Sequence, residues 1–206
     1  MIRRPPRSTL DRSSAASDVY KRQKTDWINR NLFDVPAESV KSVNISHSDG
    51  DSYTLYKDEQ GQEKFDLENM PIGQELASEL IINRFGTILQ DVQISGAKSK
   101  KVLSKQSKNT HIKIKTFEGI VGNVIAFKHD DIAYVSFEFS YEEEIGSINN
   151  EEEVKDEDIK KFIANLNSDT KNWWFEIPEF KYDIIKRRLN TITRDIQSTS
   201  PEEVTE

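Results

Sequence analysis

Cysteine is absent from this 206-residue sequence, and histidine occurs only three times. Without cysteine the chain has no disulfide, no thiolate zinc site and no cysteine nucleophile, while the cellular compartment stays open. The histidines are His47, His111 and His129, and no two of them have the spacing of a helical zinc motif. We expect them to be exposed residues at strand ends and turns, and we predict no metal site and no cofactor.

Catalytic motifs are also missing. The sequence contains neither a G-x-G-x-x-G or phosphate loop nor the G-x-S-x-G turn of a serine nucleophile. Two of the 36 acidic residues could act as a hydrolytic carboxylate pair, but nothing in the sequence singles out a pair. Asp49-Gly50-Asp51 lacks the following ladder of calcium ligands, so we predict a hairpin turn there. We therefore name no catalytic residue.

Long apolar runs and an excess of positive charge are lacking as well. No run of about 18 apolar residues is present, so no segment is predicted to span a membrane. The formal net charge is −7, made up of +4 in residues 1–23 and −11 in the remainder. Because a body this acidic repels phosphate backbones, we predict that it does not bind nucleic acid.

Residues 1–23 differ from the rest because they hold five arginines but only one lysine. They lack the apolar stretch of a secretory signal, although a mitochondrial transit peptide or a basic arm would share their composition. The stretch RPPRSTLDRSSAASDVYKRQ also closely resembles a translated sequencing adapter. We interpret residues 1–23 as an artefactual, disordered segment, and we expect the gene to have been cut upstream of Lys24.

From residue 24 onward, hydrophobic periodicity predicts an α+β fold with two lobes of mostly antiparallel sheet packed with amphipathic helices. The sequence contains a weak internal repeat, in which an aromatic-x-aliphatic strand and a proline precede a helix in each half. This repeat favours two related lobes, and a chance match is the alternative. The first lobe (24–95) is expected to hold strands at 40–47, 52–57 and 64–67 and a helix at 74–89. The second lobe (110–196) is expected to hold strands at 111–116, 121–127 and 133–141 and helices at 151–166 and 185–196. We predict a Lys-rich linker or loop at 96–109 and a disordered tail at 197–206.

Two features are candidate partner-binding sites. Residues 96–109 contain five lysines and no acid, so they either bind an anionic surface or an acidic partner or form a solvated loop. In the adjacent Trp173 and Trp174, strand alternation turns one ring inward, and the outward ring could stack on a sugar or a partner. The candidate residues are Trp173, Trp174, Lys98, Lys100 and Lys101.

Several longer motifs together resemble a known bacterial family. They are D-W-I-N-R-N-L-F-D-V-P, F-D-L-E-N-M-P-I-G-Q-E-L, I-N-R-F-G-T-I-L-Q-D-V and W-W-F-E-I-P-E-F-K-Y-D-I-I-K-R-R. Residues 24–196 resemble, as a fragment, the family called domain of unknown function 4340. The resemblance implies a protein held in the inner membrane by one N-terminal helix, with repeated α+β lobes on the periplasmic side. It also implies genes placed beside a gliding-motility-type ABC transporter.

On this basis we expect a non-enzymatic accessory or binding module outside the cytoplasm. Its partners would be proteins of a membrane transporter complex, and its only contact with the membrane would be through the missing N-terminal helix. The alternative is a cell-envelope hydrolase that uses a carboxylate pair. The family resemblance supplies no catalytic residues that could be carried over to this chain.

Overall fold

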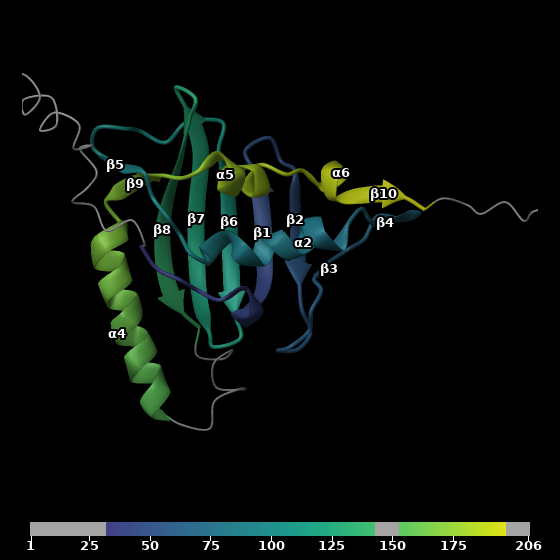
Figure 1. Ribbon diagram of the computed structural model, residues 1–206, viewed down its shortest axis with the longest axis horizontal. Coiled ribbons are helices and arrows are strands. Elements are labelled where there is room, and N and C mark those ends of the chain that lie inside the picture. The colour runs from purple at the N-terminus through teal and green to yellow at the C-terminus, as the bar shows by residue number, and fades with distance from the viewer. Residues whose placement is uncertain (1–31, 143–152, 197–206) are drawn as a thin grey trace, which may run out of the picture.

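The computed structural model describes residues 32–142 and 153–196, which build one large antiparallel sheet with helices on one of its faces (Figure 1). The strand order is β3-β2-β1-β6-β7-β8-β9-β5. The predicted α+β class is confirmed. The strands are β1 (Val40–His47), β2 (Ser52–Tyr56), β3 (Asp66–Leu67), β5 (Gly96–Ser99), β6 (Thr110–Thr116), β7 (Ile120–His129), β8 (Ile132–Tyr141) and β9 (Trp173–Glu176).

The β1–β2 hairpin forms where the sequence alternates apolar and polar residues around a tight turn. Val43 and Ile45 of β1 are fully buried, and they lie opposite Leu55 and Tyr53 of β2. Gly50 has a φ of +98°, a conformation that costs glycine little and other residues more. Hairpin register therefore follows from the inward apolar side chains and from the turn.

The strands of the two predicted lobes belong to one sheet, because β1 pairs with β6 along nearly its whole length. Val43 lies opposite Ile114, and Ile45 lies opposite Ile112. β6, β7 and β8 then continue as an antiparallel meander. The segment 96–109 consequently does not divide the sheet, and the main core draws residues from both sides of it.

Four α-helices and two 3-10 helices are described, and the helices that cover the sheet share one of its faces with the main core. In Figure 1, α2 and α5 cross the strands, while α4 lies along β8. Gly122 of β7 allows close packing here, because an added Cβ would lie 3.0 Å from the Leu89 side chain. The helices are η2 (Ala37–Ser39), α2 (Glu79–Asn83), η3 (Arg84–Leu89), α4 (Glu153–Thr170), α5 (Glu179–Ile185) and α6 (Leu189–Ile192).

The predicted helix at 74–89 is wrong in its first part. Residues Gln74–Leu76 form strand β4, which pairs with β10 (Thr193–Asp195) as a separate two-stranded ribbon. The chain becomes helical only in α2 and η3, and Leu80 of α2 is 81% exposed. Tertiary pairing with a distant strand thus overrides the local helical period.

The predicted helix at 185–196 is also wrong, because the chain breaks into α5, α6 and β10. Thr193 pairs with Leu76, and Ile196 is exposed. The helix predicted at 151–166 corresponds to α4, with residues 151–152 outside the described part.

Two further expectations need correction. The Lys-rich segment is not entirely a loop, because its first residues form β5 and pair with β9. His47 is buried rather than exposed, because its ring lies between Thr110 and the backbone carbonyl of Arg187. Residues 1–23 and 197–206 lie outside the described residues. Within the described ranges, no helix has both the length and the apolar character needed to cross a membrane.

Candidate binding site on the open sheet face

The face of the sheet opposite the helices carries polar side chains from its four central strands. Residues pointing to this face alternate along each strand with residues of the main core, as the two-residue period of a strand requires. We call this surface the open face. Its central residues are Asn44 of β1, His111 and Lys113 of β6, Asn123 of β7, and Glu138 of β8.

The Lys-rich residues 100–109, here called the strap, run from β5 to β6 and are anchored to the open face. The Leu103 side chain is buried, and the Leu103 carbonyl accepts a hydrogen bond of 2.7 Å from the Trp174 indole nitrogen. Phe127 and Tyr134 complete a small apolar cluster with them, with the Phe127 and Trp174 rings edge to face at 4.7 Å. This cluster is separate from the main core and fixes the start of the strap.

A cavity of about 290 Å³ lies beside this anchor, and we call it the strap pocket. Lys100 comes from the strap, and the other polar groups come from neighbouring strands of the open face. The polar and charged residues most relevant to binding are Lys100, His111, Lys113, Asn123, Ser136 and Glu138. The pocket therefore contains two lysines and a histidine against one carboxylate.

The electrostatics of the strap pocket favour a negative group. The Lys100 ammonium lies 5.1 Å from the centre of the Trp174 ring, so a cation–π contact orients it. Burial lowers the pKa of Lys100, and Glu138 partly offsets that effect. Partial burial and the nearby Lys105 lower the pKa of His111 from its ordinary value of 6.5. A bound anion would relieve both effects by compensating the positive charges.

Ser136 supplies an unusual polar group to the same pocket. This residue is only 3% exposed, and its hydroxyl has no hydrogen-bond partner in the described part of the chain. Buried hydroxyl groups normally have a partner, since desolvating one without compensation costs about 1–3 kcal/mol. The hydroxyl is thus available to a group that enters the strap pocket.

The structure brings together three of the five residues predicted to bind a partner. Lys98, Lys100 and Trp174 lie on the open face, and Lys98 is directly opposite Trp174 in the β5–β9 pair. The Lys98 ammonium lies 5.1 Å from the centre of the Tyr134 ring, and a hydrogen bond with Tyr134 raises the pKa of Lys98.

The other two residues are placed differently. Lys101 is exposed in the turn after β5. Trp173 is 42% exposed and, by strand alternation, points to the opposite face of β9 from Trp174. The inward ring is therefore that of Trp174. Phe162 and Phe180 are also exposed aromatic residues, and the sequence analysis did not identify them.

Sequence reasoning also missed His111, Ser136 and Glu138 as site residues. The signal that could have identified them is the alternation itself, since Ile112 and Phe137 mark the buried face of their strands. The polar residues beside them must then share the other face. Their meeting in one pocket depends on the pairing of β6, β7 and β8, which the sequence does not show directly.

A second hollow, of about 590 Å³, lies between the β1–β2 hairpin and α6 and contains Asp49 and Asp51. Arg188 forms ion pairs with both carboxylates, and the Leu189 amide donates a 3.3 Å hydrogen bond to Asp51. The hydrogen bond from Arg188 lowers the pKa of Asp49. Asp49 is also 59% exposed at its side chain. These carboxylates hold the start of α6 against the hairpin.

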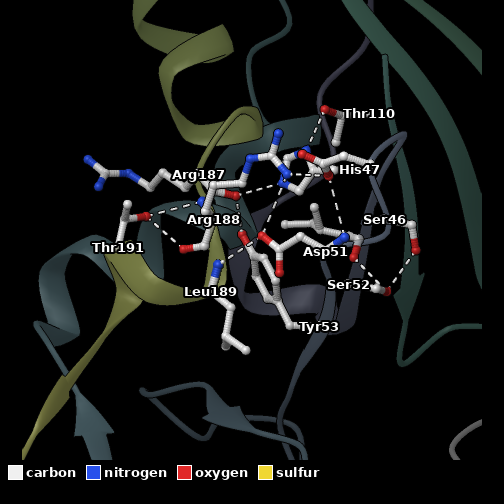
Figure 2. A network of polar contacts seen from close by, with 12 residues as sticks. Ser46, His47, Asp51, Ser52, Tyr53, Thr110, Arg187, Arg188, Leu189 and Thr191 are labelled. Carbon is white, nitrogen blue, oxygen red and sulfur yellow. Dashed lines mark hydrogen bonds and ion pairs between the residues drawn. The ribbon is translucent and has the colours of Figure 1, made fainter. Parts of the chain in front are cut away.

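Figure 2 shows the neighbouring contacts that complete this attachment. His47 Nε2 and the Tyr53 hydroxyl both donate to the Arg187 carbonyl, each at 2.8 Å. Burial raises the pKa of Tyr53, so its hydroxyl remains protonated and able to donate. The described residues contain no group of three acidic or histidine side chains that could hold a metal ion.

The fold and the surface together define an α+β protein whose single large sheet has one helix-covered face and one polar face. The chain belongs to the family described as Domain of unknown function (DUF4340), whose model matches residues 10–115. The match begins within residues 1–23 and ends in β6, so β7, β8 and the C-terminal elements lie beyond it. Searches of curated proteins and of solved structures found no match.

Proposed function

We propose that this protein is a non-enzymatic binding module that contacts an acidic protein partner through its open face. The observation that carries the proposal is the strap pocket, a positively charged hollow on a sheet face that no described helix covers. Many antiparallel sheets leave one face exposed to solvent. Such a face does not in general contain a pocket or a cluster of charges of one sign. This surface combines both properties beside an anchored strap.

The distribution of charge supports an acidic partner. The chain has a net charge of −7, whereas residues 96–109 contain five lysines and no acidic residue. Segregating positive charge on one surface of an acidic protein steers an oppositely charged partner to that surface and sets its orientation. Trp174 and Leu103 hold the strap in place before a partner binds. Binding therefore costs less conformational entropy than it would with a freely moving strap.

The proposed setting is the periplasmic side of the bacterial inner membrane, as an accessory to a gliding-motility-type ABC transporter. This part of the proposal rests on membership of the DUF4340 family and on the gene neighbourhood that its resemblance implies. The transporter's extracytoplasmic segments are then the proposed partners. Protein–protein contact, rather than chemistry on a substrate, is the proposed mode of action.

A hydrolase with a carboxylate pair has weaker support. Asp49 and Asp51 share a hollow, but Arg188 pairs with both of them. A general acid requires a carboxyl group whose pKa is raised toward neutrality. The pKa of Asp49 instead lies below its ordinary value. The arrangement accordingly favours a structural role for the pair.

Two matched substitutions test the proposal. Asn123 lies at the centre of the open face and Asn165 on the solvent side of α4, and both are exposed. Binding to the extracytoplasmic part of the neighbouring transporter is measured by biolayer interferometry. Asn123→Glu should weaken it by about tenfold or more because the added negative charge repels an acidic partner. Asn165→Glu should leave it unchanged, and equal effects of the two variants would contradict the proposal.

A further inference from the structure

The strap pocket has features that define the chemistry of its ligand more closely than charge alone. It combines an oriented ammonium at Lys100, an imidazole at His111 and the buried hydroxyl of Ser136. We propose that the pocket binds a carboxylate group carried by an acidic peptide segment of the partner protein. This inference rests on the proposed function, since it names the partner chemistry recognised by the same surface.

The groups that would contact the carboxylate come from different parts of the chain. Lys100 lies on the strap, His111 on β6 and Ser136 on β8. Lysine and protonated histidine form charge-assisted hydrogen bonds with carboxylates, and a serine hydroxyl donates one more. An acidic peptide in the pocket would also bring backbone and side-chain acceptors to the Ser136 hydroxyl, which lacks a partner among the described residues.

Glu138 and Asn123 favour a carboxylate that is carried on a peptide. The Glu138 carboxylate lies in the pocket wall, and its charge acts on Lys100. A peptide that carries a carboxylate also has backbone N–H groups, which can donate hydrogen bonds to the Glu138 carboxylate and to the Asn123 carboxamide oxygen. The wall therefore fits an acidic peptide.

Lys113 plays a smaller part in this account. Its ammonium lies 3.2 Å from Glu142, which also pairs with Lys115 at 2.6 Å. The hydrogen bonds from these lysines lower the pKa of Glu142. Lys113 is thus already compensated, whereas Lys100 has the Trp174 ring as its close neighbour. Lys100 is the cation most available to an incoming carboxylate.

The test is an NMR titration of the ¹⁵N-labelled full chain with hexaglutamate. The inference expects saturable shifts at the amides of Lys100, His111 and Ser136. Inorganic phosphate and phosphatidylglycerol vesicles distinguish other anionic sources. No saturable shift with hexaglutamate would overturn the inference. The same shifts produced by phosphate or by vesicles at lower concentration would also overturn it.

Three variants sharpen the result. Lys100→Gln should weaken hexaglutamate binding by about tenfold, because it removes a charge-assisted hydrogen bond. Lys64→Gln is the control, since Lys64 is exposed and pairs with Glu79, away from the strap pocket. Ser136→Ala should weaken binding by about threefold to tenfold without lowering the melting temperature, since no described partner loses a bond. Equal losses in Lys100→Gln and Lys64→Gln would show nonspecific charge attraction and overturn the inference.

The outcomes separate the inference from the proposed function. If Asn123→Glu weakens binding to the transporter while hexaglutamate does not bind, the open face remains the contact surface and only the carboxylate site fails. If Asn123→Glu and Asn165→Glu have equal effects, the proposed function fails, whatever hexaglutamate does.

Discussion

Leu103 is the residue through which the strap is held on the sheet. Its side chain is 7% exposed, while its neighbour Val102 is 82% exposed. Leu103 packs with Phe127 and Trp174, and its carbonyl accepts the Trp174 indole hydrogen bond. The Leu103 anchor and the 3.0 Å hydrogen bond from the Lys100 amide to the Asn172 carbonyl together fix where Lys100 lies.

Substitution of these adjacent residues should have unequal effects on stability. Leu103→Ala should lower the free energy of unfolding by about 2 kcal/mol, because it removes buried apolar surface and leaves a cavity. Val102→Ala should change it by less than about 0.5 kcal/mol, as expected for an exposed position. Urea denaturation of both variants measures the difference, and equal values would show that the strap is not anchored at Leu103.

Because His111 lines the strap pocket, we predict that binding to this pocket depends on pH. Lys105, Lys100 and Lys113 face it with positive charge, and Glu138 faces it with negative charge. Burial and Lys105 lower the pKa of free His111, so its ring is mostly neutral at pH 7. A bound carboxylate raises that pKa, so binding takes up a proton and strengthens as the pH falls.

We expect the affinity for hexaglutamate to rise by up to about tenfold between pH 8 and pH 5.5, where glutamate remains largely ionised. Of the side chains that line the pocket, His111 is the one whose ordinary pKa, about 6.5, falls within this range, so it is the group expected to titrate. Calorimetric titrations at several pH values measure the effect. The same pH dependence in His111→Gln would assign it to another group.

Among the secondary-structure elements, α4 protects an edge that the sheet would otherwise expose. β9 pairs only with Tyr134 and Val135 of β8, which leaves the rest of that edge without a strand partner in the described residues. Asn167 of α4 binds there, donating to the Phe139 carbonyl at 2.7 Å and accepting from the Phe139 amide at 2.8 Å. Its carboxamide thus replaces a neighbouring strand.

Asn167→Ala should lower the free energy of unfolding by about 2 kcal/mol, since two hydrogen bonds are lost and both Phe139 backbone groups lose their partner. Asn165→Ala is the matched control on the exposed side of the same helix and should have an effect below about 0.5 kcal/mol. Chemical denaturation compares the two. Equal stabilities of the two variants would contradict this role for α4.

The strands were predicted from sequence more accurately than the helices, for a physical reason. Val43, Ile45, Ile112 and Ile114 alternate with polar residues because one side of their strands is buried, and this period is visible locally. The failures at 74–76 and 193–195 arise because β4 and β10 pair across a long sequence separation. Ser136 and Lys100 line one pocket because segments far apart in the sequence pair in the sheet, and the sequence does not show that pairing. The pocket itself was therefore not predictable.

Strands from both sides of the Lys-rich segment share one eight-stranded sheet, and in the described residues β4 and β10 form a separate small ribbon. β1 joins β6 at the centre, and the main core contains Leu55 from one side of the Lys-rich segment and Phe137 from the other. Elements that share a sheet and a core lose their packing together. The strap is accordingly a surface feature of one cooperative unit.

We predict a single unfolding transition in urea. The curves from far-ultraviolet circular dichroism and from tryptophan fluorescence should coincide, because helices, sheet and tryptophan environment depend on the same core. Two separated transitions would instead show that the segments before and after 96–109 unfold independently.

Photo-crosslinking tests most directly whether the open face meets the partner. Benzoylphenylalanine is placed at Asn123 on the open face or at Asn165 on the exposed surface of α4, in membranes that contain the proposed transporter partner. A specific adduct with a transporter subunit from position 123, and none from position 165, is the result we predict. An adduct from position 165 alone would contradict a binding surface on the open face.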